Sequence, residues 1–390
     1  MSAAMSSAMQ VHEVTTADGF DALRDEWNAL VPRLDAPSPF QTWEWNRAWW
    51  RHFGAGHRLR LLTFRRDGAL CGVAQFHERR IGPRVLRRSL LAPLGWEDQR
   101  RRQGMTEQSQ LVFPAADMDE LLAALARWLD THRWTFVQLA GMAVPFELPQ
   151  RLSQRVVLTG KPNSFYGRAL PATYAELVAG LGKSMRDNVK YYPKLLERTG
   201  HSVSLRVANT PETIPPALDV FFALHRARAN ATAASIAHRD KFAWRDRRAF
   251  LADVAPMLAA QGQLRIGLLE VDGATVAVQI WLEYGTAMFV YYTGWDPAWS
   301  KYSVQLVATI ECIKNGIARG LGRLEFLRGG ADGNDQRNER WETQRRVRVN
   351  LTLARRPAMT RLVLRIPRVQ RRLRLGGASV GDALRTAAPG

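Results

Sequence analysis

The residues best suited to chemistry lie in the stretch "YSVQLVATIECIKNGIARGLGRLEFLRGG" (302–330), which holds a helix pattern, a glycine-rich joint and a short apolar strand. Glu325 stands in the middle of that strand, where a partly buried carboxylate can act as general base on an amine or a hydroxyl. Arg328 follows it and is suited to holding an anionic group. The alternatives are a Glu325 on a half-exposed strand, paired with an arginine, and an Arg328 that belongs to a simple turn.

The start of the helix in this stretch is a candidate anion site. The first N–H groups of a helix have no acceptor within the helix, and the helix dipole favours negative charge there. The residues at this end are Lys301, Tyr302, Ser303, Val304 and Gln305. Ser303 is equally suited to capping the helix without any ligand, so both interpretations stay open.

The glycines of "RGLGR" lie at the opposite end of the same helix, and we expect Gly320 and Gly322 to form left-handed caps there. A dinucleotide-binding glycine loop runs from a strand into a helix, whereas this one runs from a helix into a strand. The direction of the chain therefore excludes that kind of site. The sequence also holds no G-x-S-x-G, H-E-x-x-H or Walker motif and no Cys/His metal spacing, so we predict no metal.

Further candidates lie outside that stretch. The segment "KSMRDNVKYYPKLLERTG" (183–200) predicts a helix with a basic stripe, suited to a phosphate-bearing ligand or to a solvated face, and Pro193 should kink it or start a new helix. The stripe consists of Arg186, Lys190, Lys194 and Arg198. His225, in "FFALHRARA", either lines an acceptor cleft or belongs to the core. Tyr292 and Tyr302 are candidate acids for a departing thiolate, with aromatic packing as the alternative.

Length and composition set the frame for these candidates. The chain has 390 residues, 46% of them hydrophobic, which suits two domains with real cores. Cys71 and Cys312 make no disulfide framework, the first ten residues do not resemble a secretion signal, and no apolar run is long enough to span a bilayer. We therefore expect a soluble, cytoplasmic protein.

Positive charge is concentrated in particular segments of the chain. The net charge is +19, and the residues from 345 to the end hold twelve arginines against one acid. Such a tail suits peripheral contact with an anionic membrane, whereas nucleic acid is a poorer match because the tail lacks aromatic residues for base stacking. Arginines that merely solvate the surface are the alternative.

An internal duplication organises the chain. Residues 58–74 and 263–279 align at a constant offset of 205, with identical residues that include the Asp67–Gly68 and Asp272–Gly273 pairs. Each copy predicts two strands around an Asp-Gly turn, preceded by a helix and followed by a helix and a further strand. The predicted fold is α/β (α+β): two copies of one domain, each a mixed twisted sheet flanked by helices. We place the domains at 11–165 and 172–354, followed by a basic tail at 355–390.

The order of these motifs resembles the GNAT-type acyltransferases of the CelD/BcsL group, which are relatives of the FemAB proteins. The motifs are "KSMRDNVKYYPKLLERTG", "FFALHRARA", "TGWDPAWSKYS" and "EFLRGG". The resemblance as a whole covers nearly all of the chain outside the tail, and it rests on the order of the motifs rather than on any one of them. Two features depart from that family. Val304 and Gln305 stand where it has Pro-Gly, and its Tyr-Lys after Arg-Gly is missing. Glu325 stands in place of its usual aspartate.

The resemblance implies tandem GNAT-like domains, with a structural first copy and a catalytic second copy. It also implies an acyl-CoA co-substrate whose pantetheine arm enters between splayed strands near 288–293 and 323–327. The CoA pyrophosphate would then lie at the helix start, so Tyr292, Lys301, Ser303, Val304 and Gln305 become cofactor-binding candidates. Glu325 and Tyr302 become catalytic candidates, and Arg186, Lys190, His225 and Arg328 acceptor-binding candidates.

Three functional hypotheses follow from this resemblance. The first is an acyltransferase that moves an acyl group from acyl-CoA to an amine or hydroxyl of a small or carbohydrate-linked acceptor, in a context such as exopolysaccharide or cellulose biosynthesis. The second is a FemAB-like ligase that uses aminoacyl-tRNA. The third is a non-catalytic, degenerate GNAT scaffold for polysaccharide export.

Overall fold

A computed structural model of the chain describes residues 8–81, 88–96, 105–231, 240–329 and 336–364. The chain forms two compact units, one made of Met1–Asn163 with Arg346–Gly390 and the other of Ser164–Arg345. The predicted α/β class is confirmed, since each unit holds a mixed sheet with helices packed on it. None of the helices in the described ranges combines the length and the apolar character that crossing a bilayer requires.

The first unit contains a sheet in the order β1-β2-β3-β4-β5-β13, with β6 paired to β13. Its strands are β1 (Gln10–Val14), β2 (Arg58–Arg66), β3 (Ala69–Ile81), β4 (Arg88–Pro93), β5 (Phe136–Ala143), β6 (Val156–Thr159) and β13 (Gln344–Ala354). Its helices are α1 (Ala17–Asp21), α2 (Arg24–Leu30), α3 (Trp43–Phe53), α4 (Met118–Thr131), α5 (Gln150–Ser153) and α12 (Pro357–Leu364). The apolar side of α4 packs on this sheet, and the two together form the unit's main core.

The second unit contains a sheet in the order β7-β12-β11-β10-β9-β8. Its strands are β7 (Asn163–Ala169), β8 (Val203–Ala208), β9 (Leu264–Val271), β10 (Ala274–Tyr284), β11 (Ala287–Trp295) and β12 (Arg323–Arg328). Its helices are α6 (Tyr174–Ala179), α7 (Lys183–Arg198), α8 (Ile214–Ala229), α9 (Arg245–Ala260), α10 (Val304–Ala318) and α11 (Gln336–Glu339). A 3-10 helix, η6 (Pro297–Tyr302), leads into α10.

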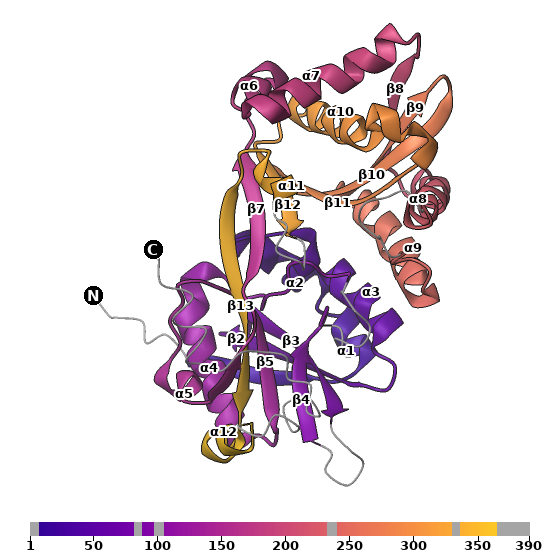
Figure 1. Cartoon of the computed structure of the whole chain (residues 1–390). Coiled ribbons are helices and arrows are strands. Elements are labelled where there is room, and N and C mark those ends of the chain that lie inside the picture. Colours follow the sequence, from indigo (N-terminus) through magenta and orange to yellow (C-terminus); the bar gives the residue numbers. More distant parts are fainter. Residues whose placement is uncertain (1–7, 82–87, 97–104, 232–239, 330–335, 365–390) are drawn as a thin grey trace, which may run out of the picture. The chain divides into compact units, whose positions relative to one another are not determined.

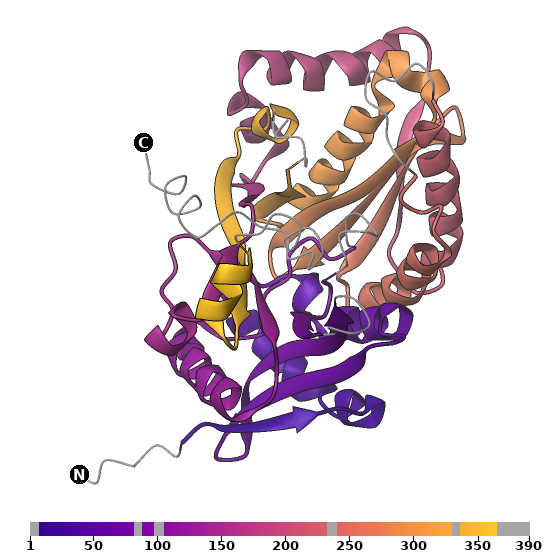
Figure 2. The ribbon, with the colours of Figure 1, turned by 60° about the horizontal axis from the view of Figure 1, so that its bottom comes forward.

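Helices cover both faces of the sheet in the second unit. In Figures 1 and 2, α7 and α10 lie on one side of β8–β11, and α8 and α9 lie on the other. The α10 side buries Ile310 and Ile313 against Met288 of β11 and Leu324 of β12. A strand that is buried on both faces reads as a near-continuous apolar run, which accounts for the sequence of β10.

The two Asp-Gly hairpins of the duplication form as predicted. β2 pairs with β3, and β9 with β10, both antiparallel. Asp67 and Gly68 have φ of 52° and 81°, and Asp272 and Gly273 have φ of 51° and 82°. Two successive positive φ values define the tight turn whose twist matches a hairpin, and Asp-Gly is among the residue pairs that adopt it most readily. The two copies therefore share their turn geometry as well as their sequence.

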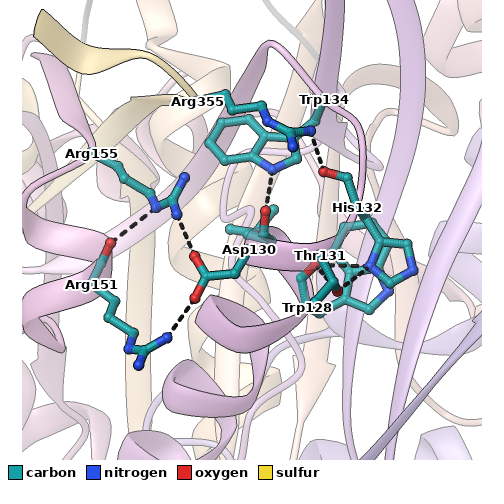
Figure 3. Close-up of polar contacts among 9 residues, drawn as sticks. Trp128, Asp130, Thr131, His132, Trp134, Arg151, Arg155 and Arg355 are labelled. Atoms are coloured by element: carbon teal, nitrogen blue, oxygen red, sulfur yellow. Dashed lines mark hydrogen bonds and ion pairs between the residues drawn. The ribbon is translucent and has the colours of Figure 1, made fainter.

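The division of the structure differs from the predicted domain boundaries at the C-terminal end. The sequence placed residues up to 354 in the second domain, whereas the first unit includes the chain from Arg346 onwards. β13 runs antiparallel to β5, and Arg355 just beyond it donates to the carbonyl of His132 at 2.6 Å. Figure 3 shows this contact beside Asp130 at the end of α4, which binds Arg151 and Arg155. Of the predicted tail (355–390), the described part ends at residue 364.

Two predictions about local backbone need correction. Gly320 has φ of 81° and ends α10 as expected, but Gly322 is absent from the left-handed residues, because the chain there already bonds to Thr286 as it enters β12. Pro193 does not start a new helix, since α7 runs through it from Lys183 to Arg198.

Candidate functional site

Two neighbouring parallel strands separate in the middle of the second unit. β11 and β12 pair only at Ala287–Arg323, Met288–Leu324 and Phe289–Glu325 among the described residues. Beyond this point β11 continues along β10 as far as Trp295, and β12 continues along β7. The strands thus leave a gap between them, at the position that the sequence analysis expected.

Irregular backbone marks both sides of this gap. In β11, Tyr291 and Tyr292 lie opposite the single residue Ile280 of β10, so β11 carries a β-bulge. In β12 the register shifts between Glu325 and Leu327, and Leu327 has φ of 58°. Bulges bend a strand and strengthen its twist. Two bulges on the facing strands explain why the ladder stops where it does.

The N-terminus of α10 follows β11 through η6. Ser303 occupies the capping position, but its φ of 48° is left-handed and its side chain makes no capping hydrogen bond. The alternative in which the Ser303 side chain caps the helix is therefore wrong. In this conformation the carbonyl of Ser303 accepts from the Leu306 N–H in the first turn at 2.8 Å. A left-handed non-glycine residue is strained by about 1 kcal/mol or more, and such strain is concentrated at functional sites.

Several hydrogen-bond donors lie at this end of the helix. The first turn of α10 contains no acidic residue. The N–H groups of Val304 and Gln305 stand at its start, where a helix offers them no acceptor. In addition, the side-chain nitrogen Nε2 of Gln305 is buried and has no hydrogen-bond partner in the described part of the chain. Because a buried donor normally has a partner, this arrangement suits a bound anion.

The hydroxyl of Tyr302 contacts a histidine side chain. This hydroxyl lies 3.2 Å from Nε2 of His201, whose Nδ1 lies 2.7 Å from Asp272. The tyrosine ring also contacts Trp299, and the Lys301 ammonium lies 5.3 Å from its centroid. Through His201, the Tyr302 hydroxyl links η6 to the hairpin that contains Asp272. This contact favours a positioning role for Tyr302 over the predicted role as catalytic acid.

Glu325 is buried, with 2% of its surface exposed. It pairs with Arg323, two residues earlier on the same strand. Because Leu324 faces α10 and side chains alternate along a strand, Glu325 lies on the opposite face, together with Phe289. Its carboxylate lies over Gly167 of β7, where any Cβ would overlap it. The expected pairing with an arginine is present, but Glu325 is buried rather than on a half-exposed face.

The remaining donor-side and acceptor-side candidates are spread over the unit. Tyr292 is 6% exposed and lies in the β11 bulge, where its ring packs on Phe242 at 5.0 Å. Arg328 is exposed at the end of β12. Lys190 is exposed on α7, whereas the Arg186 guanidinium donates to the Leu181 carbonyl at 2.7 Å and so holds the turn before α7.

His225 sits in an aromatic cluster that joins α8 to β11. Its Nδ1 lies 3.1 Å from the Thr293 carbonyl, which makes Nδ1 the protonated nitrogen of the neutral ring. Its Nε2 is buried and lies 3.9 Å from an oxygen of Asp240. Burial lowers the pKa of His225, more than its Thr293 and Asp240 contacts raise it. Gly294 lets α8 approach closely, because a Cβ there would overlap the backbone of His225.

Residues 183–341, which include all of this site except Gly167, match the family model of the acetyltransferase (GNAT) domain. This segment is a GNAT domain. The match begins at α7 and ends just after α11, so it covers the gap, the start of α10 and Glu325. In the part of the chain that the structure describes, no three His, Cys, Asp or Glu side chains are grouped to hold a metal ion.

Solved structures with the same overall fold extend the comparison beyond the GNAT domain. FemX has a TM-score of 0.62 at 11% identity, over 91% of this chain and 99% of its own. A protein of unknown function from Bacteroides thetaiotaomicron has a TM-score of 0.55 at 12% identity, over 89% of this chain and 100% of its own. L-PGS from Bacillus licheniformis has a TM-score of 0.50 at 9% identity, over 90% of this chain and 97% of its own. At these identities the likeness shows the fold alone. No curated protein matches the sequence.

Several residues at or near the site were not singled out from the sequence as site residues. Gly167 lies outside the matched segment and far from Glu325 in the sequence, and only strand pairing brings them together. His201 and Asp272 are 71 positions apart. Gln279 is buried inside β10, and its amide bonds to the bulge of β11. Of these residues, Gln279 could have been noticed in the sequence, because it is a polar residue inside an otherwise apolar strand.

Proposed function

We propose that the GNAT domain transfers an acyl group from acyl-CoA to an amine or hydroxyl of a small or carbohydrate-linked acceptor. The observation that carries this proposal is the gap between β11 and β12, which lies beside a helix start rich in unpaired donors. A pantetheine arm can pair with exposed strand edges as a third strand would. The phosphates would then meet the N–H groups of Val304 and Gln305 and the Gln305 amide.

The proposed reaction is direct attack on the thioester. The acceptor nitrogen or oxygen bonds to the thioester carbon and the C–S bond breaks, so CoA leaves as a thiolate. Backbone N–H groups of β11 along the gap would stabilise the negative oxygen of the tetrahedral intermediate. Glu325 would accept the acceptor's proton, directly or through a water molecule, and solvent would return a proton to the thiolate.

Thermal unfolding with and without ligand tests the proposal. Acetyl-CoA and longer acyl-CoAs should raise the Tm, because a ligand that binds only the folded state stabilises it. Glu325→Gln should lower kcat by about 10²-fold or more while leaving the acyl-CoA-induced Tm shift in place. Arg328→Ala should raise KM for the acceptor. The absence of a Tm shift with every acyl-CoA would overturn the proposal.

A second candidate is a donor whose acyl group is carried on tRNA. It is favoured by the net charge of +19 and by the exposed basic side chains of α7, Lys190, Lys194 and Arg198. Binding of aminoacyl-tRNA that weakens steeply with salt, together with no response to acyl-CoA, would select this candidate. A protein that responds to neither donor would fit a non-catalytic scaffold.

A further inference from the structure

The side chain of Gln279 takes up the hydrogen bonding that the β11 bulge leaves unmet. Gln279 lies in β10 and is 1% exposed. Its Nε2 donates to the Tyr292 carbonyl at 2.9 Å and to the Ile280 carbonyl at 2.8 Å. Where two residues of β11 oppose one residue of β10, a backbone group loses its ladder partner. The Gln279 amide replaces that partner, so the bulge leaves no buried carbonyl unpaired at Tyr292.

The same side chain reaches the helix that begins at the proposed phosphate site. Oε1 of Gln279 lies 3.3 Å from the hydroxyl of Thr309 in α10. That hydroxyl also lies 3.0 Å from the Gln305 carbonyl, so its single proton can go to either acceptor. Thr309 is itself 6% exposed. A buried chain of contacts thus runs from the bulge of β11 through Gln279 to the first turns of α10.

We propose that Gln279, supported by Thr309, is a positioning residue that maintains the β11 bulge and thereby holds the gap open for the acyl donor. Without the amide, the Tyr292 carbonyl loses this donor, and straightening β11 would give it a backbone N–H in its place. A straightened β11 would extend its pairing with β12 beyond Phe289 and close the gap. The inference rests on the proposed function for the identity of what enters the gap, but the bulge itself can be measured without a ligand.

The test uses the full chain and three substitutions. Gln279→Leu removes both halves of the amide at similar volume, Thr309→Val removes the hydroxyl, and Thr309→Ser restores it. Gln75→Leu is the matched control, because Gln75 is a buried glutamine of β3 in the first unit, bonded to the Gln110 carbonyl at 2.5 Å and outside the GNAT domain. Hydrogen exchange reports the backbone, and calorimetric titration with acetyl-CoA reports donor binding.

In Gln279→Leu we expect slower exchange of the amides at 290–293 and 326–328, because new strand pairing protects them, and acetyl-CoA binding weaker by about tenfold or more. Thr309→Val should show a smaller change in the same direction, and Thr309→Ser should restore wild-type values. Gln75→Leu should leave both readouts unchanged. Slower exchange across the gap is informative because general destabilisation would accelerate exchange instead.

The outcomes separate this inference from the proposed function. If the wild-type protein binds no acyl-CoA, the proposed function fails, while the exchange measurement still decides the role of Gln279. If exchange at 290–293 and 326–328 is unchanged or faster in Gln279→Leu, the inference is overturned, whatever the donor does. Should Gln279→Leu not fold, the comparison of Thr309→Val with Thr309→Ser decides by the same criterion.

Discussion

Gln305 stands at a position where GNAT acyltransferases of the resembled group have a glycine. A glycine there would let a phosphate approach the backbone closely. The structure instead places an amide there whose buried nitrogen has no partner in the described residues. A side-chain donor can compensate for the lost backbone access, because it adds a further hydrogen bond to the anion. Gln305 thus becomes a donor-binding candidate in its own right.

Gln305→Glu should separate ligand binding from helix stability. A carboxylate in the first turn interacts favourably with the helix dipole, which offsets the cost of placing charge where the Gln305 nitrogen is buried, so the Tm without ligand should change little. The same carboxylate repels a phosphate and replaces a donor by an acceptor, so acyl-CoA affinity should fall by about tenfold or more. Differential scanning fluorimetry and titration measure the two effects. Unchanged affinity in Gln305→Glu would remove the phosphate from this helix end.

Glu325 shows how far sequence reasoning reaches at the residue scale. Its place in a strand was predictable from the apolar pattern of "RLEFL", and the structure has it in β12. Its burial, its pairing with Arg323 and its position over Gly167 were not, because they depend on which strand lies beside β12. A glycine 158 positions away in the sequence makes room for the carboxylate, and no local pattern contains that information.

A network around Glu283 joins β10 to the C-terminal end of α10. Arg319, the residue that follows α10, donates to Glu283 at 2.7 Å, and Arg265 of β9 and the Trp281 indole donate to the same carboxylate. Burial opposes the ionisation of Glu283, but hydrogen bonds from Arg319 and Trp281 and the charges of both arginines outweigh it. They hold the pKa of its carboxyl below the ordinary value. The charged form is therefore favoured in the folded state.

This network predicts a specific pH dependence for Glu283→Gln. Because the folded pKa lies below the unfolded one, the stabilisation is present above the ordinary carboxyl pKa and is lost as the pH falls through the folded value. At pH 7 the variant should be less stable by about 2 kcal/mol, the range of hydrogen bonds to charged groups. Urea unfolding at pH 7 and below pH 4 checks this. A difference between wild type and variant that does not shrink in acid would contradict the prediction.

At the element scale, local sequence patterns were sufficient to predict the elements whose structure depends only on residues close in the sequence. The Asp-Gly turns and the 3.6-residue period of α10 each identify their element within a dozen residues. Elements that depend on distant partners were beyond such signals. The β11 bulge needs β10 and Gln279, and the assignment of β13 to the first unit depends on its pairing with β5, which lies about 200 positions earlier. The left-handed Ser303 depends on η6 before it.

At the scale of the whole molecule, the two copies of the duplicated domain differ at the place where a donor would bind. In the first unit, β4 and β5 also pair in parallel, and among the described residues they do so at Leu90–Phe136 and Leu91–Val137 only. The chain's own segment 109–112 lies beside this opening. Val112 exchanges two hydrogen bonds with Val73 of β3. Gln110 binds Arg348, which also binds the Gly141 carbonyl of β5.

The helix that follows differs as well. α4 of the first unit corresponds to α10 of the second, but its first turn carries Asp119 and Glu120, whereas the first turn of α10 has no acid. Carboxylates at a helix N-terminus occupy the favourable positive end of the dipole and repel a phosphate. With residues 109–112 beside its opening and an acidic helix start, the first unit is less suited to an acyl-CoA than the second. This supports the proposal that the first copy is structural.

The asymmetry of the two copies predicts one donor per chain. Calorimetric titration with acetyl-CoA should give a stoichiometry of one, and Gln305→Glu in the second unit should weaken that single binding event. Asp119→Asn with Glu120→Gln is the control, because it removes the acidic repulsion of α4 while segment 109–112 still lies beside the opening. This double variant should therefore remain at one donor per chain. Two equivalent binding events in the wild type would show that the first copy still binds donor and would refute the division of roles between the copies.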